Sequence, residues 1–256
     1  MTLSRRFGLA CVMLAIAIPL ACINAQEPKK GDPKAAPKIE GGLVRLSPDH
    51  DAWLDLDKKR VVLKGHTCMR EGQLEMMVTL VGTKEHEAVV AVRTKAFHVH
   101  AALLRLGAES GSPVRFQPKY MPATGTEIEV TFEWVDAAGV KRTVRAQEWA
   151  RSVKTQQEMS IPFVFGGSGF YVDDNTKQQH YLAEEGDFVC VSNFPTAMID
   201  VPVQSSQGND SLLFEVFTER MPPPKTPITV YLTPKLKDKK AEEKKGEVKK
   251  AEAKAP

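Results

Sequence analysis

The chain has 256 residues, of which 35 are basic and 32 are acidic, giving a formal net charge of +3. The basic excess lies outside the presumed domain, since residues 41–234 hold 20 basic and 24 acidic residues. Proteins that read nucleic acid carry their basic residues on the folded domain, so we expect no nucleic-acid partner. A region of this length is sufficient for one hydrophobic core.

Residues 1–25 have the pattern of a secretory signal peptide. Arg5 and Arg6 precede an apolar run at 7–21, which Pro19 interrupts. A basic start, an apolar stretch of about 15 residues and a small residue at the exit are typical of export signals. The run is too short for a membrane span of about 20 residues. We therefore predict an exported protein, either periplasmic or secreted.

The end of this segment allows two forms of export. Cleavage after Ala25 releases the mature chain without an anchor. In the alternative, Cys22 follows the small residue Ala21, as in bacterial lipoproteins, and becomes acylated. A lipid on Cys22 is then the one predicted link to a membrane.

Two lysine-rich flanks surround the presumed domain. Residues 26–40 are rich in lysine and proline, and residues 235–256 hold nine lysines, five acidic residues and no aromatic residue. Such segments cannot bury enough apolar surface to offset the entropy lost on ordering. We predict that both are disordered and that 41–234 forms a single domain.

Most of 41–234 shows strand patterns. Apolar and polar residues alternate along 53–57 and resume at 60–63, which predicts a hairpin. A second hairpin is predicted from 127–134 and 140–149, around the turn 136–139. Further strands are expected at 74–81, 88–92, 161–165, 188–191, 212–217 and 228–232.

One segment, at about 96–106, has the helical period instead. Its apolar residues form one row on the helix and a second row on the adjoining flank: Phe97, Ala101 and Leu104, then Val99, Leu103 and Leu106. Gly107 supplies a stop signal. We predict an α+β fold, a predominantly antiparallel β-sheet with this one main helix packed on it.

Known catalytic templates do not fit the glycine-rich segment 166–169. A nucleophile elbow places glycine two residues after the serine, whereas Phe170 follows Ser168 at that distance. The segment also lacks the length and ending of a phosphate-binding loop. A turn between two strands is the simpler interpretation, with a catalytic Ser168 as the alternative. We assign no catalytic residue and predict no cofactor.

The histidines offer a base or a metal ligand only through the fold. His98 and His100 are two residues apart, which separates them by about 200° around a helix. His86, between Glu85 and Glu87, is either a charged strand start or a base with orienting acids. The alternative is a metal site assembled across strands, for which the candidates are His66 and His86 together with Cys68 and Cys190.

The mature domain holds two cysteines, Cys68 and Cys190. In an oxidising compartment such a pair suggests one disulfide. The alternative is two buried free thiols. Two cysteines are too few for an iron–sulfur cluster with four thiolate ligands.

An ordered set of short motifs resembles the YdjY-domain family over about 64–232. The motifs lie at 64–68, 72–75, 84–89, 100–107, 165–169 and 186–195. The family consists of exported bacterial proteins, often lipoproteins, without an established activity. Some members carry a ferredoxin-like label, which the cysteine pattern of this chain does not match.

The resemblance places five residues at recurring family positions: Glu87, His100, Gly167, Ser168 and Asn193. It implies that Gly167 serves backbone geometry and that Asn193 forms a turn. Glu87 and His100 are either a buried polar pair or part of a site. We define the candidate polar site as five residues: His86, Glu87, His100, Ser168 and Asn193.

Three functions follow, in decreasing order of preference. The first is a non-enzymatic binding or structural protein of the cell envelope, with an unknown partner or ligand. The second is a metal-binding or redox accessory protein that uses His86, His100 and the cysteine pair. The third is a hydrolase with Glu87 or His86 as its base.

Overall fold

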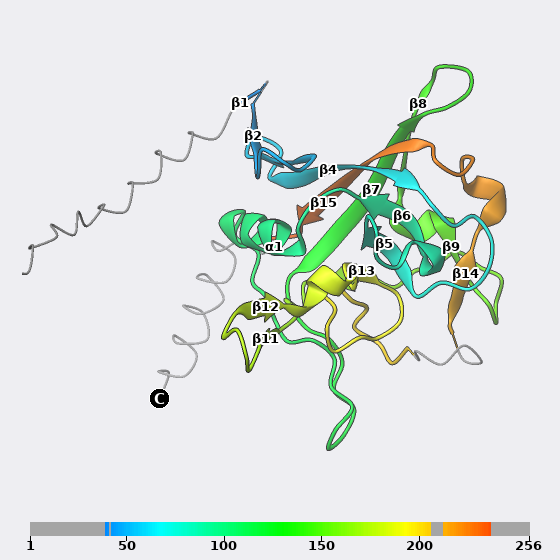
Figure 1. The fold of residues 1–256 in the computed structure, drawn as a ribbon. Helices are drawn as coiled ribbons and strands as arrows, with labels where there is room; N and C mark the ends of the chain where they lie inside the picture. Colours follow the sequence, from blue (N-terminus) through cyan, green and yellow to red (C-terminus); the bar gives the residue numbers. More distant parts are fainter. Residues whose placement is uncertain (1–38, 41, 206–211, 237–256) are drawn as a thin grey trace, which may run out of the picture. The chain divides into compact units, whose positions relative to one another are not determined.

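β-Strands are the main regular elements of the computed structural model, which describes residues 39–40, 42–205 and 212–236 (Figure 1). The predicted signal peptide with Cys22, the leader up to residue 38 and the tail from residue 237 lie outside the described residues. β1 (Ile39–Glu40) pairs with the next strand, so the sheet begins before the predicted boundary at residue 41. Among the described residues, no helix has the length and apolar character to cross a membrane.

Eleven of the described strands form one mainly antiparallel sheet. They run in the order β1-β2-β3-β4-β15-β7-β10, with β6, β5, β13 and β8 attached beside this path. Their bounds after β1 are β2 (Leu43–Arg45), β3 (Ala52–Asp55), β4 (Arg60–Thr67), β5 (Met76–Leu80), β6 (Ala88–Val92), β7 (Glu127–Val135), β8 (Lys141–Arg145), β10 (Phe163–Val164), β13 (Val189–Cys190) and β15 (Pro227–Pro234).

The sheet branches along β4. Its first residues pair with β3, whereas its last three residues, from Gly65, pair with β6 on the same edge. At the branch, a Cβ atom on Gly65 would lie 2.1 Å from the Ala91 carbonyl oxygen. Real Cβ atoms do not approach so closely, and glycine alone lets β4 and β6 come together here.

Both predicted hairpins are present. β3 pairs with β4, and β7 pairs with β8, each antiparallel. The predicted strand 140–149 is too long, because β8 ends at Arg145 and the 3₁₀ helix η2 (Ala146–Trp149) follows. The Glu148 carboxylate accepts the Arg145 N–H at 2.9 Å, and the buried Trp149 ring lies 4.8 Å from the Phe132 ring. Capping and burial thus end the strand.

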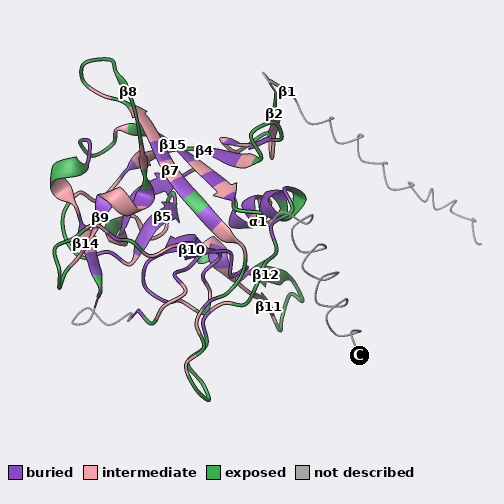
Figure 2. Ribbon diagram, turned by 180° about the vertical axis from the view of Figure 1, so that it is seen from behind, coloured by how far each residue is buried: buried purple, intermediate pink, exposed green. Residues whose placement is uncertain are grey.

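The predicted helix is confirmed as α1 (Ala96–Arg105). Its buried residues are Ala96, Val99, Ala102 and Leu103. The row of Phe97, Ala101 and Leu104 is exposed instead, although its spacing is that of a core-facing row. The helix is apolar on both sides and the domain covers one of them, as the two colours along α1 in Figure 2 show.

The remaining elements are short. β9 (Ala150–Ser152) pairs with β14 (Phe214–Val216), and β11 (Phe170–Val172) pairs with β12 (Gln179–Tyr181). The other 3₁₀ helices are η1 (Glu85–Glu87), η3 (Leu182–Glu185) and η5 (Thr218–Arg220). The predicted antiparallel sheet with one α-helix is therefore found, and the described chain is mainly β rather than an even α+β mixture.

Candidate functional site

A group of charged side chains lies at the connection between β5 and β6. These two strands are parallel, so the chain must return along their length within residues 81–87. Gly82 begins the return with a positive φ of 84°, and its N–H donates to Glu85 Oε1 at 2.8 Å. η1 follows, and its glutamates meet two different sets of partners.

Glu85 meets His66 and Cys68. The three side chains offer ligand atoms that all lie within 4.8 Å of one another, and each residue is half-buried. Cys68 N–H donates to the Val89 carbonyl at 2.9 Å, which fixes the end of β4 against β6. Burial and then the nearby Glu85 carboxylate raise the pKa of the Cys68 thiol to about 12.

Glu87 faces Glu75, the residue before β5. Burial, followed by the charge of Glu87, raises the pKa of Glu75. His86 lies beside them with Nε2 3.3 Å from Glu87 Oε1, but its side chain is 75% exposed. The predicted association of His86 with Glu87 is thus present, at the surface.

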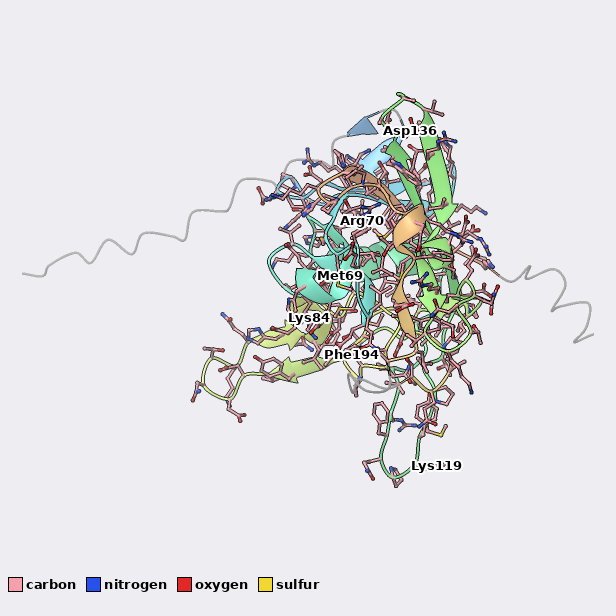
Figure 3. The ribbon with its side chains drawn as sticks, turned by 90° about the vertical axis from the view of Figure 1, so that its right-hand side faces the viewer. Met69, Arg70, Lys84, Lys119, Asp136 and Phe194 are labelled. Carbon is pink, nitrogen blue, oxygen red and sulfur yellow. The ribbon has the colours of Figure 1, made fainter. Side chains whose placement is uncertain are left out.

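Lys84 reaches away from η1 to Asp187. Its Nζ lies 2.7 Å from Asp187 Oδ1 and 4.7 Å from the centre of the Phe194 ring (Figure 3). Burial lowers the pKa of Lys84, but the bond to Asp187 and its charge outweigh that effect, so the pKa is raised. The Asp187 side chain is only 5% exposed, and its other oxygen accepts the Thr196 hydroxyl.

His100 lies in a different place, on α1 beside the β11–β12 hairpin. Its Nδ1 is 2.8 Å from the Tyr181 hydroxyl, which donates to the Gly167 carbonyl at 3.0 Å. Burial lowers the pKa of His100. Gly167 has a φ of 88°, and a Cβ there would lie 2.8 Å from Ser110 Cβ. Gly167 therefore serves backbone geometry next to His100.

Ser168 lies in the turn before β11. Its φ is 57°, and its hydroxyl donates to the Thr196 carbonyl at 2.5 Å. This bond holds the turn against a neighbouring segment. The arrangement fits the glycine-rich turn expected from the sequence.

Asn193 is fully buried and holds two segments together. Its Oδ1 accepts the Ser205 N–H at 2.8 Å, and its Nδ2 lies 3.3 Å from both Asp200 Oδ1 and the Val201 carbonyl. The amide thus crosslinks a turn.

The candidate polar site therefore divides into three places. Glu87 and His86 are at η1, His100 lies at Tyr181 beside the turn that holds Ser168, and Asn193 is buried elsewhere. Of the predicted metal candidates, His66 meets Cys68 and Glu85, whereas His86 belongs to the Glu87 pair.

The predicted Cys68–Cys190 disulfide is absent, because both cysteines are free. β5 and β6 lie between the two strand ends that carry them. Three strand spacings of about 4.8 Å place the two Cα atoms roughly 14 Å apart. A disulfide needs Cα atoms within about 7 Å.

An exposed apolar surface lies where α1 meets the β11–β12 hairpin. We call its members the apolar surface: Phe97, Ala101, Leu104, Phe170 and Val172. Its four large side chains are between 46% and 56% exposed. The Phe97 ring lies 6.5 Å from the Phe170 ring, and the buried Tyr181 ring lies 6.2 and 5.0 Å from them. The Tyr181 ring thus packs beneath the two phenylalanines, and the bonds of its hydroxyl to His100 and to the Gly167 carbonyl hold it there.

Several of these features were not predicted. The Lys84–Asp187 pair joins residues 103 positions apart, and no local pattern indicates such a contact. Glu85 was not predicted to meet His66 and Cys68, because the contact depends on the path of the short connection between β5 and β6. The sequence did contain a sign of the apolar surface. The helix has apolar residues on two sides, and a single sheet can cover only one of them.

The comparisons with known proteins give one match. Residues 52–233 match the model of the YdjY domain. No curated protein matches the chain significantly, and no solved structure does. The match covers most of the chain and includes η1, Cys68, Cys190, α1 and the β11–β12 hairpin. The chain belongs to the YdjY domain family.

Proposed function

We propose that this YdjY domain is a non-enzymatic binding protein of the cell envelope, and that its apolar surface docks another protein. The observation that carries the proposal is the half-exposure of Phe97, Leu104, Phe170 and Val172 on two adjacent elements. Contiguous exposed apolar side chains mark interaction sites on soluble proteins. Export through residues 1–25 supplies the location, with or without a lipid on Cys22.

The rigid setting of the hairpin supports a docking role. Among the described strands, β11 and β12 pair only with each other. A lone two-stranded hairpin has marginal stability in water, yet here Tyr181 ties it to α1 through His100. The surface is thus preorganised, which reduces the entropy that binding costs.

The charges around the apolar surface define the partner. The hairpin turn holds Asp173 and Asp174, and η3 holds Glu184 and Glu185. Basic residues nearby are Lys95, which pairs with Glu184 at 3.9 Å, Lys177, and Arg105 in the last turn of α1, so four acidic residues stand against three basic ones. The acidic excess favours a partner with an apolar patch and a basic rim.

The separation of the polar candidates argues for binding rather than catalysis. A general base needs an orienting group and a reacting atom within hydrogen-bond reach. His86 and Glu87 are paired at an exposed position, whereas the other polar candidates act in turns and at Tyr181. The structure therefore offers no described cluster in which these residues act together on one substrate.

Photocrosslinking tests the docking proposal. Benzoylphenylalanine replaces Phe170 in the full-length protein, in the cells that make it, and replaces Val140 in a matched control at the exposed β7–β8 turn. We expect the Phe170 position alone to give a crosslink to one other protein, identified by mass spectrometry. That partner, once purified, must bind the unmodified protein directly. Absence of a specific crosslink, or a crosslink only to a second copy, would contradict the proposal.

A further inference from the structure

A second feature goes beyond docking and stands independently of it. His66 and Cys68 are two residues apart at the end of β4, and residues at this spacing point to the same face of a strand. Glu85 comes from η1, 17 or more positions further along the chain, and completes a group whose ligand atoms lie within 4.8 Å of one another. One nitrogen, one sulfur and one oxygen donor thus face a common point.

The backbone around this group is held in place. Gly65–Thr67 pair with β6, and the N–H groups of Cys68 and Met69 donate to Val89 and Ala88 at 2.9 and 3.1 Å. The Glu85 carboxylate accepts the Gly82 N–H at 2.8 Å, which restricts its rotation. His66 and Cys68 are therefore fixed to β6, and Glu85 lies on the connection that leads into the same strand.

We propose that His66, Cys68 and Glu85 bind one zinc-class transition-metal ion. Imidazole nitrogen, thiolate sulfur and carboxylate oxygen are the donors that zinc takes, whereas calcium and magnesium need oxygen donors. Thiolate binding also favours zinc-class ions over harder metals. The bound form contains the thiolate, so binding releases the thiol proton to solvent.

The spacing of the donors suits such an ion. Metal–ligand bonds of about 2.0–2.3 Å around a tetrahedral zinc place ligand atoms about 3.3–3.8 Å apart. The separations here are at most 4.8 Å, so small rotations of the half-buried His66 and Cys68 side chains toward Glu85, which keeps its bond to Gly82, are enough to close the site. Three protein ligands leave the fourth position to water or an external ligand.

His86 is excluded from the proposed site by its own contacts. Although adjacent to Glu85 in sequence, it is 75% exposed and its Nε2 lies 3.3 Å from Glu87. His86 therefore provides a matched control. It lies on the same 3₁₀ helix as Glu85, and it carries the same side chain as His66.

Metal titration of the full-length protein, stripped with a chelator, tests the inference. Cobalt serves as the spectroscopic probe and zinc as its competitor. We expect one equivalent of Co²⁺ to bind with a thiolate-to-cobalt charge-transfer band, and one equivalent of Zn²⁺ to displace it. His66→Ala, Cys68→Ser and Glu85→Gln should each weaken binding at least about 100-fold, the upper range seen for outer-shell changes. His86→Ala should bind as the wild type does.

Near-ultraviolet circular dichroism of each metal-free variant checks folding. Should Cys68→Ser fail to fold, Glu85→Gln preserves side-chain shape and supplies the same test. The inference is overturned if the band is absent, if it persists in Cys68→Ser, or if His86→Ala weakens binding as much as His66→Ala. Phe170→Ser should leave metal binding unchanged, so failure of the docking proposal and failure of the metal site are distinguishable.

Discussion

At the scale of single residues, the environment decides what each polar side chain does. His100 and Asn193, both singled out in the sequence by the family resemblance, have different surroundings. The His100 ring is held by the Tyr181 hydroxyl, whereas the Asn193 amide is enclosed by backbone groups and Asp200. Lys84 and Asp187 form the pair that local sequence did not indicate. Their contact joins the η1 connection to the segment before β13.

The Lys84–Asp187 pair should contribute measurably to stability. Asp187→Asn removes the charge and leaves Lys84 without its carboxylate partner in a setting where the Asp187 side chain is 5% exposed. Losing a charged hydrogen-bond partner at such a position costs about 1–3 kcal/mol in the free energy of unfolding. Urea denaturation measures this loss.

The control for this variant is the exposed Lys141–Glu133 pair, in which Lys141 is 66% exposed. Lys141→Met should change the free energy of unfolding by less than about 1 kcal/mol. Equal losses of unfolding free energy in the two variants would contradict the claim that the Lys84–Asp187 pair stabilises the fold more than an exposed ion pair does.

Asp200 should make stability fall as pH rises. Burial, only partly offset by hydrogen bonds from Val201 N–H and Asn193, raises its pKa from 3.8 to about 7. The folded state therefore binds this proton more tightly than the unfolded state, so its stabilising effect is full below pH 3.8 and is lost as pH rises to about 7. Urea titrations of wild type and Asp200→Asn across this window should show the wild type losing stability relative to the variant. A constant difference would refute the assignment.

At the scale of elements, local pattern predicts much of the fold and little of its assembly. Alternation located β3–β4 and β7–β8, because side chains along a half-buried strand point in turn to the core and to solvent, whereas β6 was located by its continuous run of apolar residues. The pairing of β15 with both β4 and β7 joins distant segments, which no local period encodes. The same limit applies to the candidate site, since Glu85 meets His66 and Cys68 only after β5 and β6 pair in parallel.

The branch in β4 yields a prediction about packing. Gly65→Ala places a Cβ 2.1 Å from the Ala91 carbonyl oxygen, so β4 and β6 must separate. Overpacking of this kind costs about 1–3 kcal/mol in the free energy of unfolding. Gly169→Ala is the control, because its Cβ meets only the flexible end of Leu182 at 3.3 Å. Thermal unfolding should show a lower midpoint for Gly65→Ala alone, and equal midpoints would contradict the role of the branch.

At the scale of the whole molecule, the domain combines a covered core with an apolar surface that the described residues leave exposed. The helix period correctly located α1, but its more regular apolar row lies outside the core. The apolar pattern predicted two rows on the helix but did not indicate which of them packs on the sheet. A helix with two apolar sides is consistent with a domain that packs on its own sheet and then on a partner.

The affinity of the purified crosslinking partner tests this account most directly. Isothermal titration should give one binding site, and Phe97→Ser and Phe170→Ser should each weaken it by at least about 30-fold, the loss expected for a hot-spot side chain at about 2 kcal/mol. Val140→Ser, equally exposed at the β7–β8 turn, should bind as the wild type does. Wild-type affinity in both phenylalanine variants would contradict the claim that the apolar surface is the binding face.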